Sequence, residues 1–140
     1  MPTYEKQFCV EVLTPNKRIT GADAVMVVIP AADGQIGVLA RHMPLVALHG
    51  AGVLGIQTPD GKIAEYFISG GFTRFISNAM TVLAEVCHPL ETLKEDAIRK
   101  ELETAHALPA GDLEQRARRI AAIELASAKL AAIQRGGKKE

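Results

Sequence analysis

The sequence predicts a mainly β domain followed by a pair of α-helices, because its composition changes near residue 90. The first 90 of its 140 residues carry all six aromatic residues, nine of the twelve glycines and six of the seven prolines. Glycine and proline between short β-branched runs are typical of strands separated by turns. The last 50 residues carry ten basic and nine acidic groups and are rich in Ala, Leu, Glu, Arg and Lys, which favour helices. We therefore expect a β-domain over residues 1–90 and a helical hairpin over residues 91–140.

The overall composition excludes several classes of protein. Sixteen basic residues balance sixteen acidic ones, so the chain lacks the strongly basic face that a nucleic-acid backbone demands. A hydrophobic content of 48% is enough for a buried core, and two cysteines are too few for a disulfide scaffold. No apolar run reaches the roughly 18 residues of a membrane span, and residues 1–6 show no signal-peptide or transit-peptide character. We therefore expect a soluble, intracellular globular protein that does not bind nucleic acid.

Short apolar runs predict the strands. Phe8, Val10 and Val12 alternate with other residues over positions 7–13, as in a strand with one face inward. The continuous apolar run over positions 25–29 predicts a strand covered on both faces, which Pro30 ends. The other predicted strands span residues 18–21, 36–39, 44–48, 52–57, 63–69, 72–76 and 79–86.

Turn signals separate these runs. Residues 32–35, 58–61 and 77–78 have the chemistry of tight turns, and the glycine pair at 70–71 allows a sharp turn or a bulge. Pro89 ends the β region. Eight or more short strands at this spacing predict a β-sandwich.

Two helices follow the β-domain. Thr92 is placed to cap the first, with Glu95 as its capping-box partner, and residues 108–111 (Leu-Pro-Ala-Gly) end that helix. Asp112 and Gln115 repeat the capping pattern for the second helix. The predicted apolar faces are Leu93, Ala97, Ile98, Leu102 and Ala105 in the first helix, and Leu113, Ala117, Ile120, Ile123, Ser127 and Leu130 in the second.

Charge separates the two predicted helices. Residues 91–111 carry three basic and five acidic groups, whereas residues 112–139 carry seven basic and three acidic ones. Arg116, Arg118 and Arg119 lie within one turn of the second helix. A basic helix of this kind can bind an acidic helix or loop of another protein, or it can be a solvated face that the first helix satisfies. An isolated hairpin buries only a thin seam, so we expect it to dock on the β-domain or on a partner.

Three segments of the β region carry recognisable motifs. Residues 30–45 (PAADGQIGVLARHMPL) fit the pattern P-x-x-x-G-x-x-G-[IV]-[LY]-x-x-H-x-P-L, and residues 68–72 (ISGGF) and 81–85 (TVLAE) form two strand motifs. Together they resemble the signature and strand motifs of the epsilon subunit of F-type ATP synthases. The order of the motifs and the helical tail also agree, so the resemblance covers essentially the whole chain, and the three motifs are specific together.

The resemblance implies a non-catalytic rotor subunit. In this family a ten-stranded β-sandwich lies at the foot of the central stalk and binds the gamma subunit and the membrane-embedded c-ring. The helical hairpin can fold onto the sandwich or extend toward the alpha and beta subunits and inhibit ATP hydrolysis. An acidic loop of the beta subunit then meets the basic helix, at Arg116, Arg118 and Arg119. The implied location is peripheral, on the cytoplasmic face of a bacterial inner membrane, with membrane contact only through the c-ring.

The resemblance also implies interface residues. Gln35 corresponds to the loop that faces the c-ring, where many members carry Glu; glutamine keeps the hydrogen bonding but loses the charge. Arg41 and His42 correspond to positions near the gamma and c-ring contacts. The alternative for His42 is a histidine that satisfies local backbone.

A regulatory nucleotide site is disfavoured. Many bacterial epsilon subunits carry [IL]-D-x-x-R-A at the start of the first helix, and some bind ATP there. Asp96 and Arg99 match this pattern, but Glu95 replaces the apolar residue and Lys100 replaces Ala. A carboxylate would repel phosphate, so we expect Asp96 and Arg99, three residues apart, to form an ordinary helix ion pair, and no cofactor.

Enzyme and metal sites are also disfavoured. Cys9 and Cys87 fall in or at the end of strands, where inert thiols are common, and His88 follows without a C-x-x-C motif. The four histidines form no H-x-x-x-H pair, so we expect a non-catalytic protein without a metal. The alternative from another class is a free-standing β-sandwich that binds a small ligand under a helical lid.

Overall fold

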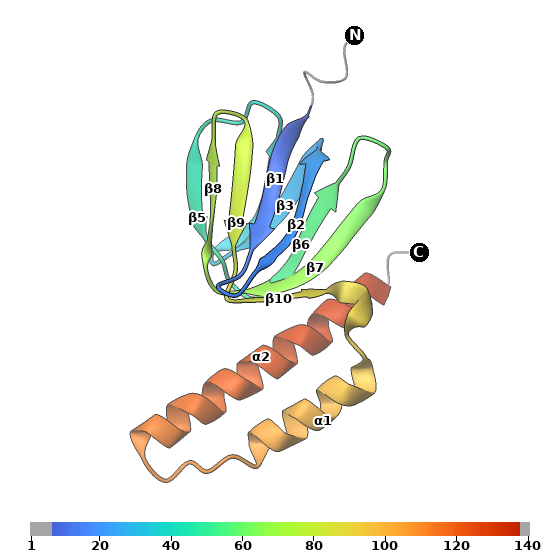
Figure 1. Cartoon of the computed structure of the whole chain (residues 1–140). Coiled ribbons are helices and arrows are strands. Elements are labelled where there is room, and N and C mark those ends of the chain that lie inside the picture. Colours follow the sequence, from blue (N-terminus) through green and yellow to red (C-terminus); the bar gives the residue numbers. More distant parts are fainter. Residues whose placement is uncertain (1–6, 138–140) are drawn as a thin grey trace. The chain divides into compact units, whose positions relative to one another are not determined.

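The computed structural model describes residues 7–137 and divides the chain into two compact units, one up to Pro89 and one from Leu90 onward (Figure 1). Residues 1–6, which the sequence predicts to carry no targeting segment, lie outside the described residues. Residues 138–140 also lie outside them. Each unit is described by itself below.

The first unit is the predicted β-sandwich, with ten described strands in two five-stranded sheets. The first sheet has the order β2-β1-β9-β8-β5 and the second has the order β10-β7-β6-β3-β4. The strands are β1 (Phe8–Leu13), β2 (Arg18–Ala24), β3 (Met26–Ala31), β4 (Gly34–Leu39), β5 (Leu45–Leu48), β6 (Gly52–Gln57), β7 (Ile63–Ser69), β8 (Phe72–Ile76), β9 (Ala79–Leu83) and β10 (Val86–Pro89).

Alternation along the strands builds the core between the two sheets. Phe8, Val10 and Val12 are buried, as their spacing predicts. The rings of Phe8 and Phe75 meet edge to face, with centroids 5.3 Å apart. Strands β1 and β9 run parallel, whereas the other paired strands of the described chain run antiparallel. The core is completed by Ala24, Val27, Ile29, Val38, Leu54, Ile56, Ile68, Met80, Val82 and Ala84.

The prediction that Pro30 ends its strand is wrong. Strand β3 continues through Pro30 to Ala31, and its pairing with β6 covers only Met26–Val28. Beyond Val28 this side of β3 meets residues 49–50 instead of β6, and the carbonyl of Pro30 accepts the N–H of Gly50 at 2.9 Å, a bond that does not need the missing proline N–H. The same strand is also not covered evenly on both faces, because Val27 and Ile29 are fully buried while Met26 and Val28 are only half-buried.

The predicted strand over residues 79–86 is two strands in different sheets. Strand β9 ends at Leu83, and β10 begins at Val86. Between them the chain crosses from one sheet to the other: the N–H of Ala84 donates to Leu13 in the first sheet, and that of Glu85 donates to Ser69 in the second. Alternation continues across this crossing, so hydrophobicity alone does not reveal it.

Glycines allow the close approach beside the crossing. Gly70 and Gly71 both have positive φ values, 75° and 80°. A Cβ on Gly71 would overlap the backbone carbonyl of Leu83. The predicted sharp turn at this pair therefore requires glycine for two reasons: both residues have a positive φ, and there is no room for a Cβ on Gly71.

The second unit is the predicted hairpin of two helices. A short 3-10 helix, η2 (Leu90–Thr92), precedes α1 (Glu95–His106) and α2 (Leu113–Gly137). The Asp112 cap is confirmed: Asp112 Oδ1 accepts the N–H of Gln115 at 2.8 Å, and Gln115 Oε1 accepts the N–H of Gly111 at 2.9 Å. None of the described helices is both long enough and apolar enough to cross a bilayer.

The prediction that Thr92 caps the first helix is wrong. Thr92 belongs to η2, which the N–H of Leu93 closes by donating to the carbonyl of Leu90 at 3.2 Å. Helix α1 begins later, with Lys94 at the N-cap position and no side-chain cap. Thr92, which the capping pattern assigned to the start of the helix, instead lies in the separate turn η2.

The predicted apolar stripe of α2 is largely wrong. Leu113 is 81% exposed and Ile120 is 55% exposed, and Ala117 and Ser127 are exposed as well. Among the positions of α2 whose burial the structure describes, Ala126, Lys129 and Ala132 are buried. In α1, Ile98 and Ala105 are buried as predicted, whereas Ala97 is exposed.

His49 is buried in the first unit with both ring nitrogens engaged. Its Nδ1 lies 2.9 Å from the carbonyl of Gly70, and its Nε2 lies 2.5 Å from the Thr73 hydroxyl. A neutral ring meets both groups, donating from Nδ1 and accepting at Nε2. Burial lowers the pKa of His49 from its ordinary value of 6.5, against a smaller opposing effect of the Gly70 carbonyl.

We predict that His49 makes the fold sensitive to acid. Below pH 6.5 the unfolded chain binds a proton at His49 that the folded chain does not, so the free energy of unfolding falls as the pH drops. In the variant His49→Gln this slope should be shallower, by at most one proton, or about 1.4 kcal/mol per pH unit. Urea unfolding of both proteins at pH 7, 6 and 5 measures the difference, and equal slopes would contradict the prediction.

Candidate interaction surfaces

An apolar surface lies on the outer face of the first sheet. Val46 and Leu48 of β5 are 67% and 68% exposed, and Phe72 and Ile76 of β8 are 37% and 46% exposed. Register brings these residues together, because Leu48 pairs with Phe72 and Val46 pairs with Arg74 between the two apolar residues of β8. We call these four apolar residues the β5–β8 face. Exposed apolar groups clustered on adjoining strands are typical of a protein–protein contact.

The β4–β5 loop lies at one end of these strands. Arg41 has a left-handed φ of 64°, and Asn78 Oδ1 accepts its N–H at 2.6 Å. The N–H of His42 donates to the carbonyl of Leu39 at 3.1 Å. The His42 ring lies edge-on to Phe75, and its Nδ1 is 2.7 Å from the carbonyl of Met43. The imidazole thus contacts local backbone, while Arg41 and Met43 point to solvent as exposed side chains.

Gln35 lies at the opposite end of β4 from this loop. It is the second residue of that strand and is exposed beside the β3–β4 turn. Six positions separate it from Arg41, or about 20 Å along an extended strand. The structure therefore places the three predicted interface residues in two groups, with Gln35 at the start of β4 and Arg41 and His42 beyond its other end.

The three predicted arginines of α2 all have partners within the hairpin. Arg116 Nε donates to the carbonyl of Ala110 at 3.1 Å, and Arg119 Nε donates to the carbonyl of His106 at 3.2 Å. These bonds satisfy carbonyl groups at the C-terminus of α1 and in the following loop, where a positive charge is favourable. Arg118 pairs with Glu114 one turn earlier on α2, at 2.8 Å.

Arg99 pairs with Glu95 and not with Asp96. Its Nη2 lies 2.9 Å from the Glu95 carboxylate, and both side chains are about half exposed. Glu95 departs from the nucleotide motif described above, whereas Arg99 matches it. The pairing of these two residues therefore engages Arg99 within the helix. An exposed pair of this spacing contributes about 0.3–0.5 kcal/mol.

Lys129 and Glu101 form an ion pair between the two helices that the sequence analysis missed. Lys129 Nζ lies 3.1 Å from Glu101 Oε1, and the lysine side chain is only 10% exposed. The predicted stripe follows the spacing of apolar and small residues, and a buried lysine does not belong to such a pattern. The signal available was the single basic residue within the Ala-rich stretch 121–132.

We predict that Lys129 and Glu101 depend on each other for the stability of the hairpin, so that losing one partner costs more than replacing both. Glu101→Ala leaves the buried ammonium of Lys129 unpaired and should lower the free energy of unfolding by about 1–3 kcal/mol. Adding Lys129→Met should restore most of that loss, because an unbranched apolar chain replaces the charge. Urea unfolding followed by far-UV circular dichroism tests this, with the exposed pair variant Glu114→Ala as the control. Additive losses in the double variant would contradict the prediction.

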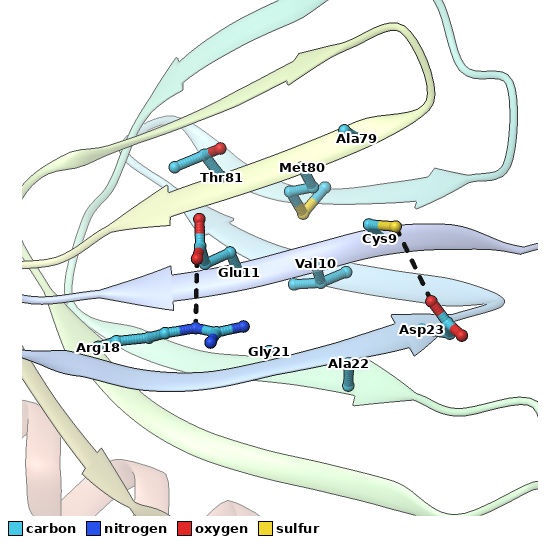
Figure 2. Close-up of a pocket in the computed structure, with 10 residues that line it drawn as sticks. All are labelled: Cys9, Val10, Glu11, Arg18, Gly21, Ala22, Asp23, Ala79, Met80 and Thr81. Carbon is cyan, nitrogen blue, oxygen red and sulfur yellow. Dashed lines mark hydrogen bonds and ion pairs between the residues drawn. The ribbon is translucent and has the colours of Figure 1, made fainter.

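A shallow hollow of about 470 Å³ lies over β1, β2 and β9 (Figure 2). Two contacts link its polar groups: Arg18 Nε forms an ion pair with the Glu11 carboxylate at 3.2 Å, and the Cys9 thiol donates to Asp23 Oδ1 at 3.9 Å. The described residues contain no His, Cys, Asp and Glu cluster that could hold a metal ion. Burial raises the pKa of the Cys87 thiol, which disfavours the reactive thiolate. In this hollow Arg18 is therefore paired with Glu11, while the Asp23 carboxylate meets the weak thiol donor of Cys9.

Comparison with known proteins gives consistent matches. A family model described as the β-sandwich domain of the ATP synthase delta/epsilon chain matches residues 7–89. An ATP synthase epsilon chain from Rhizobium johnstonii is 32% identical over 98 residues, which is 70% of this chain and 73% of the relative. One from a Nitratiruptor species is 37% identical over 98 residues, which is 70% of this chain and 76% of the relative.

Solved structures show the same architecture. A chain in the Euglena gracilis mitochondrial ATP synthase, from the OSCP/F1/c-ring assembly, matches with a TM-score of 0.80 and 26% identity over 91% of this chain and 81% of that one. A chain of the central stalk and c-ring of the Tetrahymena thermophila mitochondrial ATP synthase matches with a TM-score of 0.60 and 12% identity. That second match covers 87% of this chain and 95% of the other, and it shows the fold alone.

Proposed function

This chain belongs to the ATP synthase delta/epsilon family, and from that membership we infer that it is a non-catalytic epsilon subunit that couples the gamma subunit to the c-ring. Its relatives carry the name ATP synthase epsilon chain, and its structural match lies in an F1/c-ring assembly. In this role the chain is peripheral on the cytoplasmic face of a bacterial inner membrane and meets the membrane only through the c-ring.

The β5–β8 face is the observation that carries the proposal. A rotor subunit needs a lasting contact that transmits torque, and such contacts bury apolar surface. The face supplies that surface on a sheet rather than on a loop, so it is rigid. We assign it to the gamma subunit, together with Arg41 and His42 at the adjoining end of the sandwich.

Gln35 supports a separate contact with the c-ring. Its exposed amide lies at the other end of β4, so the sandwich can meet two partners at two ends. Because glutamine is uncharged, the contact with the polar loop of the ring rests on hydrogen bonds and not on a salt bridge.

The helical hairpin supports a restraint on ATP hydrolysis. Arg116, Arg118 and Arg119 make charge-assisted contacts inside the hairpin, but these partners are exposed carbonyl and carboxylate groups. An acidic loop of the beta subunit can replace such partners at low cost, since exposed ion pairs contribute little. In this role the hairpin reaches the alpha and beta subunits and its arginines hold them.

We predict that charge on the β5–β8 face weakens gamma binding. Val46→Asp and Phe72→Asp should each raise the Kd for purified gamma subunit by about tenfold or more, because an unpaired carboxylate must be buried. The matched control is Ile63→Asp, since Ile63 is 59% exposed on β7 of the other sheet. Titration calorimetry measures the affinities. Equal affinity in all four proteins would contradict the assignment.

We predict that the arginines of α2 restrain hydrolysis. In the reconstituted complex, replacing Arg116, Arg118 and Arg119 together with alanine should raise the ATPase rate roughly threefold or more, because charge-assisted contacts to the beta subunit are lost. Deleting residues 91–140 should do the same and leave assembly intact. Arg99→Ala on α1 is the matched control. Unchanged hydrolysis in an intact complex would refute the restraint.

A further inference from the structure

Asn78 ties together three segments that are distant in sequence. It lies in the β8–β9 turn with a left-handed φ of 60°. Its Oδ1 accepts the N–H of Arg41 at 2.6 Å, from the β4–β5 loop 37 residues earlier. Its Nδ2 donates to the carbonyl of Gln7 at 2.8 Å, just before β1 and 71 residues earlier. One amide side chain therefore joins a turn, a loop and the start of the first strand.

The bond to Asn78 accounts for the conformation of the loop. Arg41 has a φ of 64°, in a region that costs a non-glycine residue about 1–3 kcal/mol. With Arg41 in that region, the N–H of His42 reaches the carbonyl of Leu39, and the His42 ring lies against Phe75. The side chain of Asn78 thus offsets the strain of the residue that turns the loop.

We propose that Asn78 is the positioning residue of the β4–β5 loop, which it holds in its binding conformation through the amide of Arg41. The proposal rests on the proposed function, in which Arg41 and His42 meet the gamma subunit. A loop that is already ordered loses less entropy on binding than a mobile one, so the affinity of the complex depends on this tie. Asn78 acts on the loop indirectly, through the hydrogen bond that its side chain accepts from the backbone N–H of Arg41.

The chain offers a variant that removes the tie and keeps the turn. Ser77 and Asn78 both have positive φ, at 51° and 60°, and glycine fits the second position of such a turn well. Asn78→Gly therefore loses both side-chain bonds without straining the hairpin. Asn78→Asp keeps an oxygen for the Arg41 amide and loses the donor to Gln7. Ser77→Gly changes the neighbouring turn residue and is the matched control.

Three measurements on the full chain test the proposal: hydrogen exchange of the Arg41 amide, the Kd for gamma subunit, and urea unfolding. In Asn78→Gly we expect exchange of the Arg41 amide to rise about tenfold or more and the Kd to rise about tenfold, while urea unfolding shows that the chain remains folded. Asn78→Asp should recover most of the affinity, and Ser77→Gly should match the unmodified chain. A purely structural role in the turn would leave both exchange and affinity unchanged in Asn78→Gly.

Two results would overturn the inference. One is an Arg41 amide that exchanges as slowly in Asn78→Gly as in the unmodified chain. The other is unchanged affinity in Asn78→Gly when Val46→Asp has lost its affinity. If Val46→Asp also binds normally, the proposed function fails, and the inference falls with it.

Discussion

The alternation of side chains across β5 and β8 is the constraint on which the first unit depends. Because successive residues of a strand face opposite sides, Thr73 and Phe75 enter the core while Phe72 and Ile76 face outward. A register slip of one residue would exchange the two sets and expose Phe75, so the core fixes the outer face as firmly as the inner one. Buried His49 strengthens this register, because it joins Thr73 of β8 to the glycine turn at Gly70. The apolar outer face is thus held rigidly by the same pairing that builds the interior.

The helical unit is held together in a different way. Its seam contains small buried residues, such as Ala126 and Ala132, and an ion pair between Lys129 and Glu101. Arg119 adds a bond from α2 to the end of α1. Small side chains bury little area, so much of the specificity of this hairpin comes from polar contacts. Polar contacts can be exchanged for others of similar chemistry, and this suits a unit proposed to engage charged partner subunits.

Local patterns predicted most of the fold, and the failures have identifiable causes. Alternating and turn residues located nearly every strand, and the Asp112 cap was confirmed. Pro30 and the crossing after Leu83 were misjudged because both depend on which strand lies alongside, and this information is not local. Lys129 is absent from the predicted apolar face because a charged side chain enters a seam only with a partner, and its partner Glu101 lies 28 residues away. At the candidate surfaces, the motif identified Gln35, Arg41 and His42, but only the structure shows that they lie at two ends. Asn78 carried no signal beyond that of an ordinary turn residue.

The parallel pairing of β1 with β9 has a consequence for biogenesis. During synthesis β1 finds this neighbour only after residues 79–83 have been translated, and the sheet cannot close before then. Contacts between residues so far apart slow the search for the native state. Until β9 is made, this edge of β1 remains open to unwanted pairing with other strands.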